Sequence, residues 1–506
     1  MEEDMKLRYT GTLALLALVG GLLTGCMPAT TSGSAKDSQA TIALPAEPSN
    51  TDPIMTRSIA AWNMYYAMYD GLTRITADGK VVPGLATDWK HNADLSEWEF
   101  TIRPGVKFHN GEELKPSDIV YTYSTILGSE KSTNRPAVAM VKSVTAEADN
   151  VVKFTLKNPF SAWLNQVATI GIVPQDVYTK EGDNFVNAPV GTGPFKFSAW
   201  QRGVSYSLER NGDYWGDKPA LDKVTFSFVG AEDARVSGVE SGTLNAGAIP
   251  PNQVPVLKNS TQATVISSPS NGSVFLGMNS KAAGLEDVRV RQAISLAIDR
   301  DEIIKGLMGG LATPNGQLVA KGVTGFVENF PVPTTDIERA KKLLSEAGYT
   351  GEPITLEYAT VGGFPMSAEI AQAVEGYLSK AGITIKLVGT EQASLSLKMA
   401  NHKITGLYLN MWTPSSMDGD VVVNQILAGG PEDYAKDPAM AKLYLEQQAA
   451  PENQRSDVFK KIWELNRDQA YTVPLFTPSN SYAASPNLAW TPSVDGIYRA
   501  TGVAFK

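Results

Sequence analysis

The chain has 506 residues, a formal net charge of −9, and 43% hydrophobic and 19% charged positions. This apolar content can build hydrophobic cores, so a chain disordered throughout is excluded, and the negative charge argues against a non-specific nucleic-acid binder. One Cys and three His exclude an internal disulfide and a metal site built from several Cys and His side chains. The length suits about three domains or two large lobes.

The N-terminal segment has the pattern of an export signal. The apolar run of 11 residues at 13–23 is too short to span a hydrocarbon core of ~30 Å, but it has the length of a signal-peptide h-region. It ends in small residues before Cys26, and the segment resembles a bacterial lipoprotein signal, whose cysteine is lipidated and becomes the mature N-terminus. We therefore expect a signal peptide over 1–25, a flexible tether over 26–40, and lipidation at Cys26. An ordinary secretory signal or a buried cysteine is the alternative.

The first half of the chain is predicted to be rich in strands. Residues 97–102 alternate between polar and apolar side chains, and residues 151–156 and 224–229 are further strand candidates. A helix is expected to begin at Pro116, because proline suits the first position of a helix.

In the second half the hydrophobic pattern becomes helical. Residues 290–298 place their apolar side chains on one helical face. Two capping-box patterns, Asp299 with Glu302 and Thr335 with Glu338, each predict the start of a further helix.

Residues 354–412 predict a parallel sheet. The expected elements are, in order, a strand over 354–359, a helix over 365–381, a strand over 383–388, a helix over 391–401 and a strand over 406–412. This alternation implies parallel strands with right-handed crossovers, and such sheets bind ligands outside the carboxyl ends of their strands. The loop at 413–420 is therefore expected at a crevice. The sequence thus predicts an α/β protein with a β-rich first lobe and a parallel-sheet second lobe.

The residues alone reveal no catalytic centre. The sequence contains no phosphate-binding P-loop, no G-x-S-x-G nucleophile motif and no H-E-x-x-H zinc motif. Asp418 and Asp420 could form the acid–base pair of a glycosidase, but an Asp-Gly-Asp loop is at least as often a turn or a helix cap. Trp62 and Tyr66 belong to an aromatic cluster at near-helical spacing, which is more typical of a core than of a ligand platform.

Six short segments carry a resemblance to a known family. They are 69–72 (YDGL), 85–119 with VKFHNG inside it, 190–195 (VGTGPF), 210–215 (RNGDYW), 290–304 and 340–349. Together, from about residue 41 to about residue 490, they make the chain resemble the extracellular solute-binding proteins of family 5. This is the oligopeptide, dipeptide and nickel-binding group that serves ABC importers. Asn110 departs from the family, which commonly has Asp in that motif.

The resemblance implies a type II periplasmic-binding-protein-like fold, in which two lobes close over the ligand like a flytrap. Two strands should cross between the lobes, near 267–273 and 473–482. Lobe I is expected over 41–270, completed by 480–506, and lobe II over 271–479. A receptor that works by hinge closure needs no covalent step. We therefore expect no enzyme activity, no cofactor and no bound metal.

The resemblance also implies where the ligand binds. Peptide-binding members place an aspartate three residues after the tryptophan that ends the second-lobe strand, where it pairs with the peptide's α-ammonium. Here Trp412 is followed at that spacing by Ser415, so either Asp418 takes over the role or the ligand has no free ammonium there. Arg135 lies where nickel-chelate members use an arginine, with a surface arginine as the alternative. The predicted ligand contacts are Trp412, Ser415, Ser416, Asp418, Asp420, Arg135, Trp62 and Tyr66.

Together these patterns predict the substrate-binding lipoprotein of an ABC transporter, which captures small peptides outside the cytoplasmic membrane and delivers them to the permease. One alternative is the same receptor role for an oligosaccharide or a metal chelate. Another is an exported hydrolase that uses Asp418 and Asp420. The expected partners are the solute, ABC permease subunits and the membrane through the lipid anchor, with no nucleic acid, and the protein is expected to be a monomer. It would lie on the periplasmic side of the membrane if the cell has an outer membrane.

Overall fold

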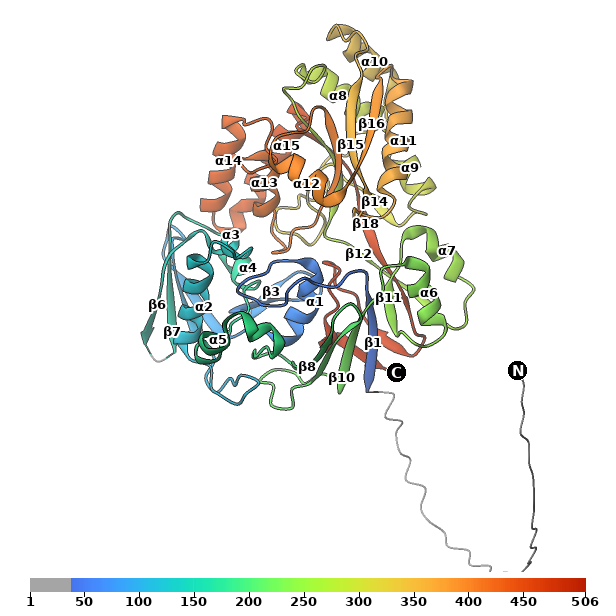
Figure 1. Ribbon diagram of the computed structural model, residues 1–506. Coiled ribbons are helices and arrows are strands. Elements are labelled where there is room, and N and C mark those ends of the chain that lie inside the picture. The colour runs from blue at the N-terminus through green and yellow to red at the C-terminus, as the bar shows by residue number, and fades with distance from the viewer. Residues whose placement is uncertain (1–37, 149) are drawn as a thin grey trace, which may run out of the picture. The chain divides into compact units, whose positions relative to one another are not determined.

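The computed structural model describes residues 38–148 and 150–506, so Cys26 and the predicted signal peptide lie outside the described residues. Within them, the largest sheet has 12 strands, in the order β16-β15-β17-β13-β18-β11-β1-β10-β9-β8, while β12 and β14 pair with β18 beside this path (Figure 1). Strand β1 (Gln39–Leu44) begins inside the predicted tether of 26–40. The tether prediction runs too far because Ala40 is buried and pairs with Val224 of the sheet.

The β-rich first lobe contains a separate antiparallel sheet. Its strands are β4 (Ala86–His91), β5 (Glu97–Ile102), β7 (Val151–Leu156) and β6 (Val141–Ala148). The strands predicted at 97–102 and 151–156 are confirmed, because alternate side chains of β5 and β7 are buried. Helix α2 (Pro116–Gly128) begins at Pro116 as expected, with Asp118 accepting a hydrogen bond from the Lys115 N–H (2.8 Å).

Helix α1 (Ile59–Met68) carries Trp62 and Tyr66. The Ser58 hydroxyl caps it by accepting a hydrogen bond from the Ala61 N–H, and most of the helix is buried in the first-lobe core. The other elements of this lobe are β2 (Thr73–Ile75), β3 (Val81–Pro83), α3 (Arg135–Val138), α4 (Trp163–Val167), α5 (Gln175–Glu181), β8 (Phe195–Gln201), β9 (Ser205–Arg210), β10 (Lys223–Phe228), α6 (Glu232–Glu240), β11 (Ala246–Ala248) and α7 (Val254–Leu257). Strand β10 corresponds to the strand predicted at 224–229.

The second lobe has the predicted alternation of strands and helices. The elements are β15 (Ile354–Val361), α11 (Ser367–Lys380), β16 (Ile385–Glu391), α12 (Gln392–Ala400) and β17 (Leu407–Trp412). Strand β15 pairs in parallel with both β16 and β17, which confirms the predicted topology. Helix α11 begins later than predicted because Met366 has a left-handed backbone (φ 65°). The sheet is also mixed, because β13 (Ser273–Met278) pairs antiparallel with β17.

Capping residues start the remaining helices of this lobe, and one of them differs from the prediction. Asp299 accepts from the Glu302 N–H (2.9 Å), as expected, but helix α10 is capped by Asp336, because the Thr335 hydroxyl donates to the Ile298 carbonyl instead. The elements are α8 (Val288–Ala297), α9 (Arg300–Gly306), β14 (Ala312–Pro314), α10 (Ile337–Glu346), α13 (Asp420–Leu427), α14 (Pro438–Ala449) and α15 (Glu452–Gln469).

Two chain segments link the lobes. Strand β12 (Thr264–Pro269) leads directly into β13, and the long strand β18 (Thr472–Ala484) pairs with both of them. Residues 472–476 of β18 pair with β13, whereas residues 479–484 pair with β12. The C-terminal strands β19 (Leu488–Trp490) and β20 (Val503–Phe505) then return to the first-lobe core. The lobe boundaries at 270 and 480 stay predictions.

One hydrophobic core contains side chains of both lobes. Ile75 and Ala168 of the first lobe pack in it with second-lobe residues that include Phe275, Met417 and Trp463. Larger cores fill the interior of each lobe. Among the described residues, no helix combines the length and the apolar character that crossing a membrane requires.

Candidate functional site

The loop that follows β17 carries Ser415, Ser416 and Asp418. Met417 has a left-handed backbone (φ 56°), and its N–H donates to the Pro414 carbonyl (3.1 Å). The backbone of Thr324 holds the turn from the other side, because its N–H donates to the Met417 carbonyl (3.0 Å) and its carbonyl accepts from the Gly419 N–H (2.8 Å). Main-chain hydrogen bonds therefore fix this loop at the carboxyl end of β17.

Asp418 anchors the loop through a buried ion pair. Its side chain is fully buried, and its two oxygens accept from the two Nη atoms of Arg455 on α15 at 2.6 and 2.7 Å. Burial alone would lower the pKa of Arg455, but the carboxylates of Asp418 and Asp420 outweigh this effect and raise it. The hypothesis that Asp418 replaces the aspartate missing at position 415 therefore finds no support. Arg455 already offsets the charge of this carboxylate, and the carboxylate is closed to solvent.

Asp420 lies in the same buried network. Its Oδ1 accepts from the side-chain amides of Gln447 (2.5 Å) and Gln448 (3.1 Å), and its own N–H donates to Asp418 Oδ1 (2.9 Å). Burial, together with the neighbouring charge of Asp418, raises the pKa of Asp420 from 3.8 to about 6. The two acids predicted as ligand contacts thus hold α13, α14 and α15 together.

Ser415 instead contacts a residue of the first lobe. Arg57, just before α1, donates from Nη2 to the Ser415 hydroxyl (2.7 Å) and from Nη1 to the Thr169 hydroxyl (3.3 Å). The guanidinium lies 5.5 Å from the ring centroid of Trp62, and the rings of Trp62 and Tyr66 are 6.3 Å apart. The structure therefore brings three of the predicted residues together, and Arg57 connects them.

Arg57 holds its positive charge without a counter-charge from the described residues. Within the described part of the chain, no carboxylate lies within 4.0 Å of its guanidinium. Burial lowers the pKa of Arg57, and among residues 38–148 and 150–506 the only polar side-chain partners of its guanidinium are two neutral hydroxyls. A guanidinium nevertheless stays protonated near neutral pH.

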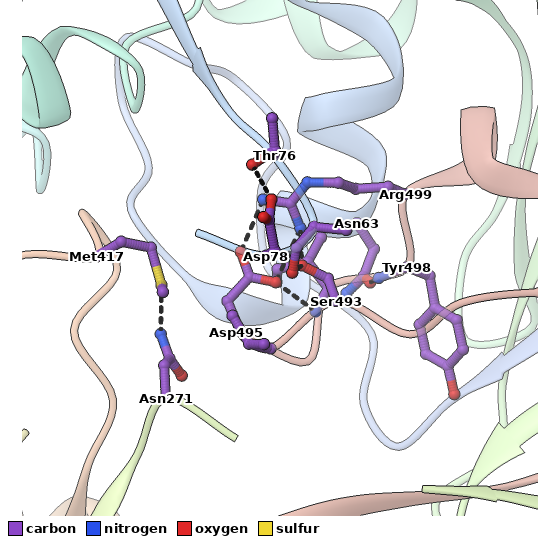
Figure 2. A network of polar contacts seen from close by, with 12 residues as sticks. Asn63, Thr76, Asp78, Asn271, Met417, Ser493, Asp495, Tyr498 and Arg499 are labelled. Carbon is purple, nitrogen blue, oxygen red and sulfur yellow. Dashed lines mark hydrogen bonds and ion pairs between the residues drawn. The ribbon is translucent and has the colours of Figure 1, made fainter. Parts of the chain in front are cut away.

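Further polar groups near the loop are buried without partners among the described residues. They are the indole N–H of Trp412, the hydroxyl of Ser416 and the amide oxygen of Asn271. The Asn271 amide nitrogen donates to the Pro414 carbonyl and to the Met417 sulfur, both at 3.0 Å, and the second contact is visible in Figure 2. Unpartnered buried polar groups are costly, so their gathering beside one loop is typical of a binding site.

The second lobe also contacts the first through backbone groups. Asn165 of α4 donates from its side-chain amide to the Ser416 carbonyl (2.9 Å). Ser161 donates from its N–H to the Gln448 carbonyl (2.9 Å) and from its hydroxyl to the Gln447 carbonyl (3.2 Å). The face of the second lobe that Asp420 organises is therefore the face that meets the first lobe.

A second polar network fixes the C-terminal segment beside Tyr66. Asp495 and Arg499 form a bidentate pair at 2.8 and 2.7 Å, and Arg499 also donates to the Ser493 hydroxyl (2.7 Å) (Figure 2). The guanidinium of Arg499 lies 4.9 Å from the Tyr66 ring centroid. A cavity of about 320 Å³ opens beside these two residues, and Asp70 and Arg74 also line it.

Arg135 is exposed at the start of α3. Its side chain forms no hydrogen bond or ion pair with any described residue, which agrees with a surface arginine. It lies two residues from Thr133, whose hydroxyl accepts from the Arg57 N–H (2.7 Å). A ligand-binding role for Arg135 stays a prediction.

Sequence reasoning missed Arg57 and Asn271. Neither belongs to a motif, and each lies far along the chain from the loop that it contacts. One signal was present for Arg57, which precedes the N-cap Ser58 of α1. The N-terminal end of a helix repels cations, so an arginine there requires another reason.

The fold is that of a two-lobed, type II binding protein. Superposition on the ABC transporter substrate-binding protein CtaP from Listeria monocytogenes gives a TM-score of 0.83, with 25% identity, and covers 92% of this chain and 99% of that one.

Comparison of sequences identifies the family. Residues 80–458 match the model of the bacterial extracellular solute-binding proteins, family 5 Middle, and the chain belongs to this family. It is 26% identical over 475 residues to the oligopeptide-binding protein AppA of Bacillus subtilis. This alignment covers 87% of this chain and 86% of the relative. It is 24% identical over 454 residues to the nickel-binding periplasmic protein of Escherichia coli, and this alignment covers 84% of this chain and 86% of the relative.

Arg455→Met tests the anchor of the loop. Removing one member of a buried pair leaves a buried charge, so we expect the free energy of unfolding to fall by about 3–5 kcal/mol. The double variant with Asp418→Asn should recover part of this loss, as measured by denaturant titration. Lys461→Met is the matched control, since it breaks only the exposed pair with Glu446 and should cost ~1 kcal/mol or less. Equal losses for Arg455→Met and Lys461→Met would contradict the anchoring role.

Asp420→Asn tests the raised pKa. Because the folded protein binds this proton more tightly than the unfolded chain, its contribution to stability is complete below pH 3.8 and is lost as the pH rises through about 6. Wild type should therefore lose stability relative to the Asn variant between these two pH values, measured by thermal unfolding. The Asn side chain can still accept both glutamine hydrogen bonds. A difference that does not change with pH would contradict the prediction.

Proposed function

We infer that the protein is a receptor that captures a small peptide-like solute outside the cytoplasmic membrane and delivers it to the permease of an ABC importer. In this role ligand contacts both lobes in the closed state, so binding shifts the population towards closure. The chain acts as a carrier and not as an enzyme, and it functions as a monomer.

The observation that carries this proposal is the contact between the two lobes at the loop after β17. Across this interface, Arg57 donates a hydrogen bond to the Ser415 hydroxyl, and Asn165 donates one to the Ser416 carbonyl. Polar groups of Trp412, Ser416 and Asn271 that lack a partner among the described residues are buried at this contact, and they would become accessible to a solute when the lobes separate. Strands β12 and β13, joined by the short segment 270–272, and the long strand β18 supply two connections about which one lobe could rotate against the other.

A peptide is the first choice of ligand because relatives at similar identity carry names such as the oligopeptide-binding protein AppA. A metal chelate is the alternative within the same role, since another relative is a nickel-binding periplasmic protein. Direct coordination of a metal by this chain lacks support: among the described residues, no three His, Cys, Asp or Glu side chains gather in a way that could hold an ion.

The hydrolase alternative is disfavoured by the state of its two acids. Asp418 is held by Arg455, and Asp420 is surrounded by two glutamine amides, and both carboxylates are buried. A glycosidase needs both acids open to the sugar on either side of the bond that breaks.

Cys26 is the proposed point of membrane attachment. An anchored receptor stays close to its permease, and the polar segment after Cys26 is suited to act as a tether. The globule would then be anchored through the first lobe, because β1 begins at Gln39.

Ligand carried through purification provides the direct test of the receptor role. We expect native mass spectrometry of gently purified protein to detect an intact small solute. Returning that solute at 100 times its Kd should stabilise the fold by about 2.7 kcal/mol in thermal unfolding. The solute should be recovered unchanged after prolonged incubation. Steady conversion of the solute to products, abolished by Asp418→Asn, would support the hydrolase and end the receptor proposal.

Cys26→Ser tests the lipid anchor. We expect the wild-type protein to partition into the detergent phase and to incorporate labelled fatty acid, because the thiol is the attachment point. The serine variant should do neither, and it should retain the signal peptide or leave the membrane fraction. Ser32→Ala, in the same segment, is the control. Incorporation of labelled fatty acid that is unaffected by Cys26→Ser would rule out lipidation at this residue.

A further inference from the structure

Arg57 has an unusual position for a cation. It precedes the N-cap of α1, where the positive end of the helix disfavours a cation, and yet its guanidinium points into the meeting of the two lobes. Its backbone is fixed there, because its N–H donates to the Thr133 hydroxyl (2.7 Å). The guanidinium therefore contacts two neutral hydroxyls and an indole ring, but none of these groups offsets its positive charge.

The partners of Arg57 leave most of its binding capacity unused. A guanidinium has five N–H donors, and within the part of the chain that the structure describes only two of them are engaged, by Thr169 and Ser415. The Thr169 hydroxyl donates its own proton to the Gln166 carbonyl (2.8 Å), so it is fully occupied. The hydroxyl proton of Ser415 has no acceptor within the described residues. The guanidinium and this hydroxyl together form a set of donors without an anion.

We propose that Arg57 and Ser415 bind a carboxylate of the solute, which supplies the counter-charge that the described residues do not provide. This inference rests on the proposed receptor function and adds the chemical class of the ligand to it. A planar guanidinium can bind a carboxylate through two parallel hydrogen bonds, and the Ser415 hydroxyl can donate a third. Trp62, against which Arg57 lies, limits the directions from which the anion can approach.

The residue at position 415 acts together with Arg57 in this proposal. An aspartate there would lie within reach of the guanidinium and would form an internal ion pair with it. The serine keeps the guanidinium in place through a neutral oxygen and leaves its charge for the ligand. The preferred solute thus has an anionic end at the loop after β17.

Competition between acids and amides tests the proposal. The wild-type protein is offered an equimolar mixture of random tripeptides with free C-terminal carboxylates and the same peptides as C-terminal amides, and bound peptides are counted by mass spectrometry. We expect the acids to be enriched about 10- to 100-fold, as is typical for a hydrogen-bonded charge pair. Nickel citrate is a third probe, which detects a chelate carboxylate if neither set of peptides is retained.

Variants assign the selectivity to this pair. Arg57→Gln should remove the preference for acids while binding of the amides persists. Ser415→Asp should remove it as well, because the introduced carboxylate would neutralise Arg57. Ser415→Ala, which removes one hydrogen bond but leaves the charge of Arg57, should weaken the preference without abolishing it. Lys131→Gln, which removes an exposed charge near the same segment, is the control for long-range electrostatics and should leave the preference unchanged. Thermal unfolding confirms that each variant is folded.

The outcomes separate the inference from the proposed function. If wild type and Arg57→Gln retain acids and amides equally, the carboxylate site is wrong and the peptide receptor stands. If nickel citrate alone is retained and Arg57→Gln loses it, the carboxylate site stands with a chelate as ligand. If wild type retains none of the three probes, both the carboxylate site and the peptide receptor are overturned.

Discussion

The buried pair of Asp418 and Arg455 is the interaction on which the candidate site depends. It joins the loop after β17 to α15, and the network continues through the glutamines of α14 to Asp420 at the start of α13. The loop is thereby held rigidly enough to place Ser415 and the Ser416 carbonyl against the first lobe. A buried charge is tolerated only when a counter-charge or several hydrogen bonds compensate for lost water, and this pair has both. Asp495 with Arg499 follows the same rule beside Tyr66. Arg57 is the exception to this rule, because it has two neutral partners and no counter-charge among the described residues. We therefore propose that the anionic group of the ligand binds beside it.

Local signals predicted much of the fold. The alternation at 97–102 and the repeated strand–helix pattern after residue 354 depend on residues close in sequence, and both are confirmed. The antiparallel insertion of β13 beside β17 was not predictable in this way, since no local pattern specifies which distant strand becomes a neighbour. The cap of α10 was misassigned for a related reason. Thr335 and Asp336 are equally good caps by type, and only the contact of Thr335 with the Ile298 carbonyl decides between them.

The candidate site was only partly accessible from the sequence, and the reason is again distance along the chain. The loop itself, with Trp412 and Ser415, follows from topology and from resemblance to the family. The state of Asp418 does not, because its partner Arg455 comes 37 residues later on another helix. Arg57 is 358 residues from Ser415. Sequence reasoning therefore identified the loss of an acid at position 415, whereas the structure adds the cation that faces the same position. Together they show that a position which is acidic in peptide-binding members of the family is here a neutral serine beside a cation.

The long strand β18 has a consequence for how the protein is made. Strand β11 of the first lobe pairs on one side with β1, and on the other with residues 482–484 of β18. The Asn63 side chain, on α1, likewise accepts from the Tyr498 N–H, 435 residues further along the chain. The lobe that is synthesised first therefore keeps an unpaired sheet edge and an uncovered helix until the last residues have been added. Exposed edges of this kind promote aggregation, so the first lobe stays vulnerable until the C-terminal segment is in place, and deleting that segment would damage the lobe at the opposite end of the gene.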